Sequence, residues 1–210
     1  SGQREEEEAT RRSVLLLEAD QVDTLFTFRP GWVFWYETNG EGFGPSNRNG
    51  FDELLWAVSG DSLVVSVDAV RGNIQWYEVR SGGLFPTSQT RLGLVPREKD
   101  LSFRDDVARE VKRRHPTFGT IEFIAPEYEP YFKTAILDPN GGVWLLRTDR
   151  SEDPVSNGGL TMVPLVGDGT LDMPLPRRAS LKAVKQNLLY CVFFDELDVS
   201  YVEVYRVRDQ

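Results

Sequence analysis

The side chains that could carry acid–base or nucleophilic chemistry are few in this sequence, which has one histidine, His115, and one cysteine, Cys191. His115 stands between a run of arginines and Pro116, where an imidazole is better suited to capping a helix end than to moving protons. Cys191 lies in the apolar run LLYCVFF, which offers no cation or helix N-terminus to activate a thiolate. We therefore expect a buried structural thiol and no catalytic residue.

Carboxylates recur in groups at Asp105/Asp106 and at Asp195/Glu196/Asp198. The second group has the oxygen ligands that calcium prefers, but it lacks the alternate-position spacing and the glycine of a calcium loop, so a turn between two strands explains it better. A hairpin turn likewise accounts for the segment Asp138 to Gly142. The sequence contains no GxSxG, P-loop, HExxH or GxGxxG motif. It predicts a protein that is not an enzyme and has no metal site and no cofactor.

Acidic residues outnumber basic ones, with 33 Asp and Glu against 24 Lys and Arg and a formal net charge of -9. Such a charge repels phosphate backbones and anionic lipid surfaces. The one basic stretch, Arg109 to Arg114, is interrupted by Glu110. No apolar run approaches the ~20 residues that span a bilayer. We therefore expect neither nucleic-acid binding nor direct insertion into a membrane.

The elements that would position a site are mostly strands. Apolar runs rich in Val, Leu, Phe, Trp and Tyr, each closed by Gly, Pro, Asn or Asp, are typical of strands. The predicted strands are 14–18, 22–28, 32–37, 54–58, 62–67, 74–79, 91–95, 120–124, 132–137, 143–147, 160–166, 170–173, 181–185, 188–194 and 201–207. Short glycine-containing connections at 59–61, 138–142 and 167–169 predict hairpins, which join antiparallel neighbours.

One segment has the periodicity of a helix instead. Phe103, Val107 and Val111 recur at helical spacing between Ser102, a suitable N-cap, and Pro116. The pairs Asp105/Arg109 and Glu110/Arg114 add support at i,i+4 spacing. We predict one surface helix over 102–114, inserted into a β-domain of residues 13–210. Residues 1–12, which include four consecutive glutamates, are expected to be a disordered acidic tail.

An imperfect unit recurs in the second half of this pattern. It reads LLWAVSGDSLVVSV, NIQWYEV and TRLGLV, then YFKTAILDPNGGVWLLRT, LTMVPLV and TLDMPLP, then LKAVKQNLLYCVFF and DVSYVEVYRV. Each copy has three consecutive strands, and the first two copies add a fourth strand that the last copy lacks. The segment SVLLLEADQVDTLFTF reads as the last two strands of a preceding unit. The repeat predicts a series of antiparallel meanders.

The segments VDTLFTF, WAVSGDSLVV, AILDPNGGVWLL and FFDELDVSYVEVYRV resemble the bacterial six-bladed β-propellers of the NHL-like group, common among exported proteins and lipoproteins. The resemblance covers most of the chain after Arg12 and corresponds to the C-terminal half of such a ring. It implies an all-β fold, a partial β-propeller of about three antiparallel four-stranded meanders with one inserted helix. It also implies a peripheral location on the periplasmic or extracytoplasmic face of a bacterial membrane.

An open half ring would expose unpaired strand edges and apolar blade faces. Three arrangements resolve this: two copies form one six-bladed ring, another chain supplies the missing blades, or the open face docks on a larger assembly. Each requires a protein partner. We expect a non-catalytic protein-binding or scaffolding subunit of a larger bacterial membrane-associated complex. A homodimer that completes the ring and a propeller that binds a glycan or small molecule in its cleft are the alternatives.

The five tryptophans are candidates for partner contact or for the core. Trp56, Trp76 and Trp144 lie in regular strands, so we expect them to pack between meanders. The irregular, aromatic-rich stretch 32–51 is expected to contact a partner. The predicted partner-binding residues are Trp32, Trp35, Tyr36 and Phe43.

Overall fold

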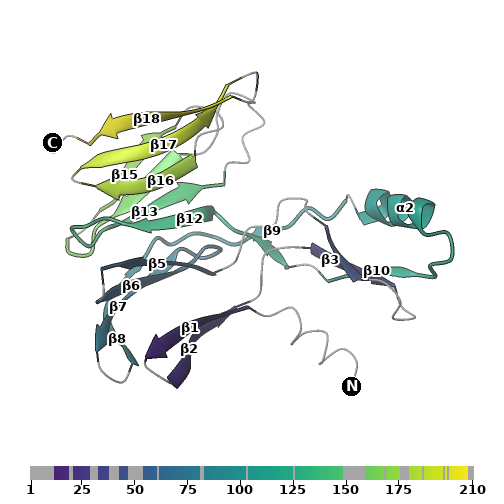
Figure 1. Cartoon of the computed structure of the whole chain (residues 1–210), viewed down its shortest axis with the longest axis horizontal. Helices are drawn as coiled ribbons and strands as arrows, with labels where there is room; N and C mark the ends of the chain where they lie inside the picture. Colours follow the sequence, from purple (N-terminus) through teal and green to yellow (C-terminus); the bar gives the residue numbers. More distant parts are fainter. Residues whose placement is uncertain are drawn as a thin grey trace.

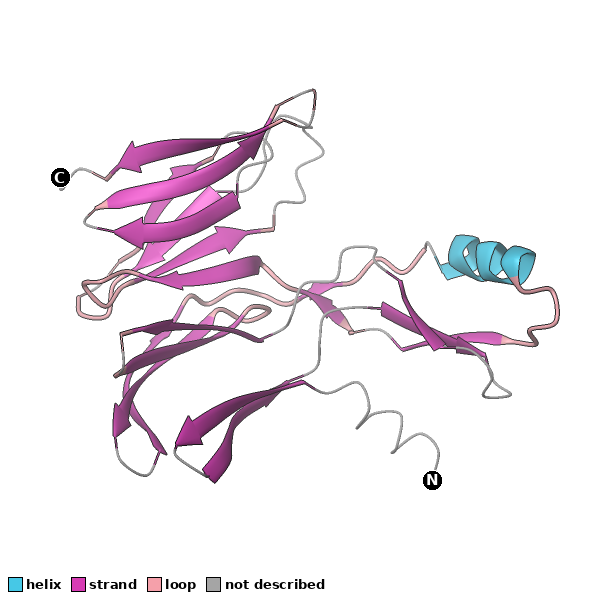
Figure 2. Cartoon of the chain, in the orientation of Figure 1, coloured by secondary structure: helices cyan, strands magenta, loops and turns pink. Residues whose placement is uncertain are grey.

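A computed structural model describes residues 12–18, 21–28, 33–37, 43–46, 54–60, 62–80, 83–102, 104–124, 126–148, 159–167, 169–175, 180–185, 187–195, 197 and 199–207. Side chains are described from Leu54 onward within these ranges, except those of Ile124 and Phe194. The described chain is all-β apart from one helix, as predicted (Figure 2). Of the predicted acidic tail, only Arg12 is described, as the first residue of the first strand.

Three antiparallel meanders form the body of the protein (Figure 1). The first sheet comprises β5 (Leu54–Ser59), β6 (Leu63–Asp68), β7 (Asn73–Arg80) and β8 (Gly83–Arg91). The second comprises β12 (Phe132–Leu137), β13 (Val143–Arg147), β14 (Gly159–Val163) and β15 (Leu171–Pro174). The third has only β16 (Ser180–Lys185), β17 (Leu188–Phe194) and β18 (Ser200–Arg206). In each sheet the strands are ordered as in the sequence, so the fold is a partial, propeller-like all-β structure.

The first and second sheets pack face to face. Their shared core is formed by buried side chains of both sheets, including Val65, Ile74 and Trp76 from the first and Val143 and Leu145 from the second. The indole Nε1 of Trp76 donates a hydrogen bond across the interface to the carbonyl oxygen of Gly141, at 3.1 Å. The first two meanders are therefore joined by both apolar packing and a buried hydrogen bond.

A second core lies between the second and third sheets. Trp144, Leu146 and Leu160 face Leu189 and Phe193 across it, and all five side chains are at most 2% exposed. The side chains of neighbouring residues in β13 point to opposite faces of the sheet. Val143 and Leu145 therefore pack in the first core, and Trp144 and Leu146 pack in the second. A strand buried on both faces must be apolar throughout, which explains the run VWLL.

An arm of small sheets projects from this stack (Figure 1). It contains the sheet β10–β3–β4, the short ribbon β9–β11 and the helix α2 (Arg104–Arg114). The arm strands are β3 (Val33–Glu37), β4 (Phe43–Ser46), β9 (Arg97–Glu98), β10 (Ile121–Ile124) and β11 (Tyr128–Glu129). A separate hairpin, β1 (Arg12–Glu18) and β2 (Gln21–Phe28), precedes it. The strand that follows the helix, β10, thus pairs with β3, which follows β2 in the chain.

The fourth strand of the first sheet was predicted wrongly. Residues 91–95 were expected to form it, but β8 spans Gly83–Arg91, and residues 92–96 are not in a strand. The sequence GLFPTSQTR is mostly polar, and Pro86 lacks the N–H of a ladder residue, so the run did not have the pattern of a strand. Pro86 is tolerated because β8 lies at the sheet edge, next to a register shift between Trp76 and Tyr77.

The helix begins at Arg104, two residues later than predicted, and ends at Arg114 as expected. Glu110 pairs with Arg114 as predicted, with Glu110 Oε1 2.7 Å from Arg114 Nε. Arg109 instead forms its ion pair with Asp106, at i,i+3 spacing, and not with the predicted Asp105 at i,i+4 spacing. Val111 is the buried residue of the helix, so α2 lies on a surface.

Candidate functional site

The predicted partner-binding residues fall in the arm. Trp35 and Tyr36 belong to β3 and Phe43 to β4, and Tyr36 pairs with Phe43 in the register of the two strands. Trp35 also pairs with Phe123 of β10, on the other side of β3. Trp32 lies outside the described residues. The structure therefore brings three of the four positions into one small sheet, and their role in partner contact stays a prediction.

Two of the three tryptophans that were predicted to be core residues are buried, and the third is exposed. Trp76 and Trp144 are in the cores as expected, at 0% and 2% exposure. Trp56 was predicted to be a core residue, and this was wrong, because its side chain is 43% exposed. Trp56 occupies the face of β5 opposite to Leu55 and Ala57, which are the residues that pack on the second sheet. The alternation along β5 thus turns the indole outward.

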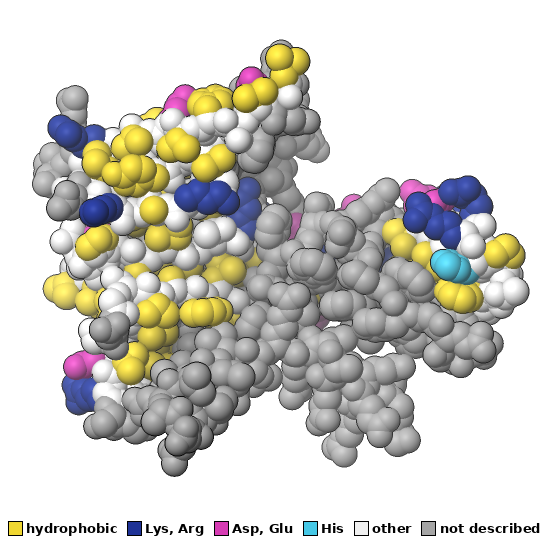
Figure 3. Space-filling model, viewed as in Figure 1, with side chains coloured by type: hydrophobic (Ala, Val, Ile, Leu, Met, Phe, Trp, Pro, Cys, Tyr) yellow, Lys and Arg dark blue, Asp and Glu magenta, His cyan; other side chains and the backbone are white. Residues whose placement is uncertain are grey.

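The third sheet presents exposed apolar side chains on β18. One face of β17 and β18, with Leu189, Cys191 and Phe193, packs on the second sheet. The opposite face carries Leu188, Tyr190 and Val192 of β17 and Val202 and Val204 of β18, and we call these five residues the outer face. Val202 is 63% exposed and Val204 51% exposed. Figure 3 shows yellow side chains over this upper sheet, with dark blue Lys and Arg side chains among them.

No described strand pairs with one side of the β18 backbone. Val207 N donates to the carbonyl of Asn187, and Asp195 N donates to the carbonyl of Val199, so these two pairs are hydrogen-bonded pairs of the antiparallel ladder. Hydrogen-bonded and non-hydrogen-bonded pairs alternate. The N–H and C=O groups of Tyr201, Glu203 and Tyr205 therefore point to β17.

It follows that the backbone groups of Ser200, Val202, Val204 and Arg206 point away from the sheet. Because β18 is the last strand in the order β16–β17–β18, no described strand pairs with them. We call these four residues the free edge. Val202 and Val204 belong to both the outer face and the free edge, so this part of the chain exposes apolar side chains and unpaired peptide groups together.

The inner side of β18 is held in place by aromatic contacts. Tyr201 stacks on the buried ring of Phe193, with ring centroids 5.5 Å apart, and Tyr205 lies 6.2 Å from the same ring. The hydroxyl of Tyr205 donates to the carboxylate of Glu203. Burial is the main cause that raises the pKa of Tyr205 to about 12 and that of the Cys191 thiol to about 11. Cys191 is thus a buried, protonated thiol, as the sequence predicted.

The turn before β18 is fixed by Asp195. One of its carboxylate oxygens accepts the backbone N–H groups of Leu197, at 2.9 Å, and Val199, at 2.8 Å. This confirms the prediction that the acidic segment 195–198 is a turn between two strands, as far as its described residues go. Among the described residues, no group of His, Cys, Asp and Glu side chains is arranged to hold a metal ion.

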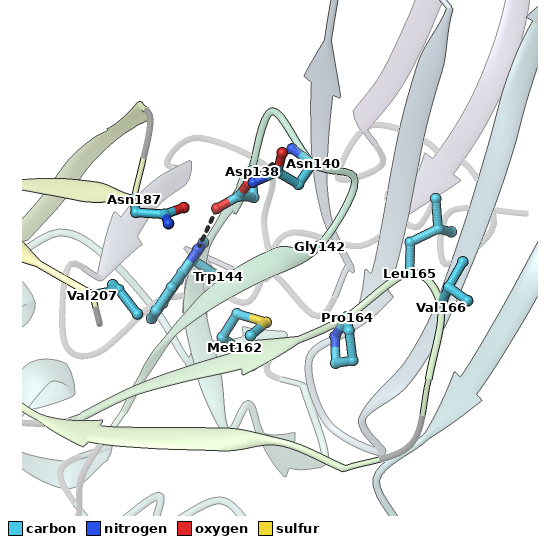
Figure 4. Close-up of a pocket in the computed structure, with 10 residues that line it drawn as sticks. All are labelled: Asp138, Asn140, Gly142, Trp144, Met162, Pro164, Leu165, Val166, Asn187 and Val207. Atoms are coloured by element: carbon cyan, nitrogen blue, oxygen red, sulfur yellow. Dashed lines mark hydrogen bonds between the residues drawn. The ribbon is translucent and has the colours of Figure 1, made fainter. Parts of the chain in front are cut away.

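A cavity of about 240 Å³ opens at one end of the interface between the second and third sheets (Figure 4). Asp138 lines it and is 9% exposed. Its carboxylate accepts hydrogen bonds from Trp144 Nε1, at 3.2 Å, and from the backbone N–H of Asn140, at 2.8 Å. Asn187, which directly precedes β17 of the third sheet, also lines it. Asp138 thus fixes the predicted hairpin and the orientation of Trp144.

His115 follows α2, where its backbone N–H donates to the carbonyl of Val111 at 2.8 Å. Its ring is exposed and stacks on Phe118. Two ion pairs from Arg113 and Arg114 lower the pKa of Glu110 to about 2. These contacts stabilise the end of the arm helix and form no cluster with a nucleophile among the described residues.

The sequence analysis did not single out Val202 and Val204. The run DVSYVEVYRV was predicted as a strand, but its sequence alone does not show which of its faces is exposed. No family model, no curated protein and no solved structure matches the chain. Among the described residues, no helix is both long enough and apolar enough to cross a bilayer.

Proposed function

We propose that the chain is a non-catalytic protein-binding or scaffolding subunit that docks on a larger assembly through its third sheet. The observation that carries this proposal is the outer face with its free edge, where Val202 and Val204 are more than half exposed beside backbone groups that no described strand pairs with. Exposed apolar surface of this kind marks interaction sites, and natural proteins cover or block long strand edges. The resemblance to exported bacterial propellers favours an assembly on the outer side of a bacterial membrane.

The size of the outer face indicates how much of the partner interface it supplies. The whole face of the third sheet that contains the outer face, with two strands of seven residues beside one of six at ~4.8 Å between strands and ~3.3 Å per residue, has an area of roughly 300 Å², so the outer face itself is smaller. A stable interface covers ~800 Å² on each partner. Side-chain contacts on this face alone are therefore too few, and the partner must also engage the free edge or the arm.

The test compares two surfaces of equal chemistry on the same chain. The tagged chain is expressed in the cells from which the protein comes and is purified from them. The masses of its complexes are then measured by native mass spectrometry. We expect the double variant Val202→Lys, Val204→Lys to lose the complex that the unaltered chain forms. Val58→Lys is the matched control, because Val58 is 50% exposed on the first sheet, and it should retain the complex. A complex that survives the double variant, or a chain that is monomeric in its cells, would contradict the proposal.

The cavity beside Asp138 supports a second candidate, a propeller that binds a small polar molecule. Asp138, Asn140 and Asn187 offer hydrogen-bonding groups there. Two observations make it the weaker candidate: the cavity is smaller than the ~300–1,000 Å³ of typical ligand pockets, and the Asp138 carboxylate already accepts two hydrogen bonds. Saturable binding of a monosaccharide by the isolated chain, lost in Asn187→Ala, would favour it.

A further inference from the structure

The cavity between the second and third sheets contains a buried carboxylate that has hydrogen bonds but no cationic partner (Figure 4). Asp138 is 9% exposed. Its Oδ1 accepts the backbone N–H of Asn140, and its Oδ2 accepts Nε1 of Trp144. Both donors are neutral groups. Among the described residues, no lysine or arginine forms an ion pair with Asp138. The negative charge of this side chain is therefore not neutralised within the described chain.

A carboxylate in this setting can still bind a donor from outside the chain. Aspartate is almost never this buried unless it is paired, because a charge removed from water costs free energy that an opposite charge must offset. An ionised carboxylate offers about four acceptor positions. The hairpin uses two of them, one on each oxygen. About two positions are therefore left for a ligand that enters the cavity.

The rest of the cavity is mostly apolar. Met162, Pro164, Leu165 and Val207 line it together with the carboxylate, and Asp138 is the one charged residue among the described residues that do so. Its volume of about 240 Å³ corresponds to roughly eight water molecules at ~30 Å³ each. A ligand that fits this space is short, and it has one positively charged end and an apolar body.

We propose that the cavity binds a small primary alkylammonium ion, with the ammonium group on Asp138 and the alkyl chain against Met162 and Leu165. An ammonium group has three N–H donors and a positive charge, so it can fill the remaining acceptor positions and neutralise the carboxylate. The net charge of -9 also attracts cations to the chain. This inference does not depend on docking through the third sheet. It rests on the second candidate function and names the chemical class of its ligand.

Other classes of ligand fit the cavity less well. A calcium ion takes six or more oxygen ligands, whereas the described lining has one carboxylate, and no group of acidic, His and Cys side chains among the described residues is arranged to hold a metal. An anion would be repelled by Asp138. A neutral sugar could donate to the free acceptor positions, but it would leave the charge without a partner. The cavity therefore favours an organic cation.

The experiment compares a charged and a neutral probe of equal length. Butylammonium and 1-butanol are each titrated into the isotope-labelled chain, and the NMR signal of the Trp144 indole N–H is followed. This group reports on the site because it donates to the same carboxylate, and Trp144→Phe identifies its signal. We expect a saturable shift with butylammonium at a Kd on the order of 1 mM, and at least ~10-fold weaker binding of butanol, which forms no charge-assisted hydrogen bond.

Two pairs of measurements on variants separate binding from folding. Asp138→Asn removes the charge at constant size, so it should weaken butylammonium at least ~10-fold and change butanol binding less than ~3-fold. Because Asp138 also orders the hairpin, a second site is needed. Val166 lines the cavity and is 86% exposed, so a substitution there should leave the chain folded. Val166→Lys places a competing positive charge at the cavity and should weaken butylammonium at least ~5-fold, whereas the matched control Val166→Gln should change it less than ~2-fold.

Three results would overturn the ammonium site. The first is equal binding of butylammonium and butanol, and the second is equal binding of butylammonium by Val166→Lys and Val166→Gln. The third is the absence of a saturable shift at ~50 mM butylammonium, about fifty times the expected Kd. Binding of a monosaccharide without binding of butylammonium would overturn this ligand class while keeping the second candidate function. The docking proposal fails separately, when Val202→Lys, Val204→Lys leaves the cellular complex intact.

Discussion

Replacing Trp76 with phenylalanine tests the stacking of the first two sheets. The side chain of Trp76 is fully buried in the first core, and its Nε1 is the donor to the buried carbonyl of Gly141. Phenylalanine fills most of the space but leaves this carbonyl without a partner, at a cost of ~1–3 kcal/mol. The missing part of the ring leaves a small void, which costs a further ~1 kcal/mol.

We therefore expect Trp76→Phe to lower the free energy of unfolding by about 2–4 kcal/mol, which corresponds to a fall in Tm of roughly 5–15 °C for a domain of this size. Urea unfolding followed by circular dichroism, together with calorimetry, measures both. Trp56→Phe is the control, because Trp56 is 43% exposed, and it should change stability by less than ~1 kcal/mol. Equal effects of the two substitutions would refute the stacked arrangement.

Three further predictions concern single groups. Asp138→Asn should lower the free energy of unfolding by ~1–2 kcal/mol in urea titrations, because an amide has one acceptor oxygen for the two hydrogen bonds that the carboxylate accepts. Cys191 should resist thiol reagents at pH 8 until the chain unfolds. Burial raises the pKa of its thiol from 9.0 to about 11. The stability that this thiol contributes is therefore present below pH 9 and is lost as the pH rises to about 11. Cys191→Ala should therefore show a shallower loss of stability over that range. Glu110 has its pKa lowered from 4.5 to about 2, so the helical circular dichroism of the unaltered chain should decrease more than that of Glu110→Gln as the pH falls from 4.5 to 2.

The body of the fold could be predicted from the sequence because its signals are local. The segment 138–142 defines one hairpin, and Gly141 adopts a φ of 91°, which a glycine tolerates. The predicted bounds of β12, β13 and β17 agree with the structure. These strands are continuous apolar runs that end at polar turns, and such runs have clear limits.

The arm could not be predicted because its sheet joins segments that are far apart in the chain. Pairing of β10 with β3 brings Ile121 beside Glu37, and periodicity within either segment carries no information about the other. The short strands β4, β9 and β11 were missed for the same reason, since each is defined by its partner. The orientation of Trp56 also depends on which face of β5 meets the second sheet, and not on residue type.

The site was predicted in part. The repeat predicted three strands for the last meander, and the third sheet has three described strands. The aromatic residues of the stretch 32–51 were predicted to contact a partner, whereas the exposed apolar side chains of β18 also include the valines Val202 and Val204. Val202 and Val204 could not be distinguished from core valines before the pairing register of β17 and β18 was known.

Hydrogen exchange of β18 is the most direct test of the central claim, that the third sheet is uncovered in the isolated chain and covered in its assembly. In the isolated chain, we expect rapid exchange at Val202 and Val204 and slow exchange at Glu203 and Tyr205, whose N–H groups bond to β17. In the assembly from its own cells, the valine amides should become protected. Valine amides that are already protected in the isolated chain, or that exchange equally fast in the assembly, would contradict the account.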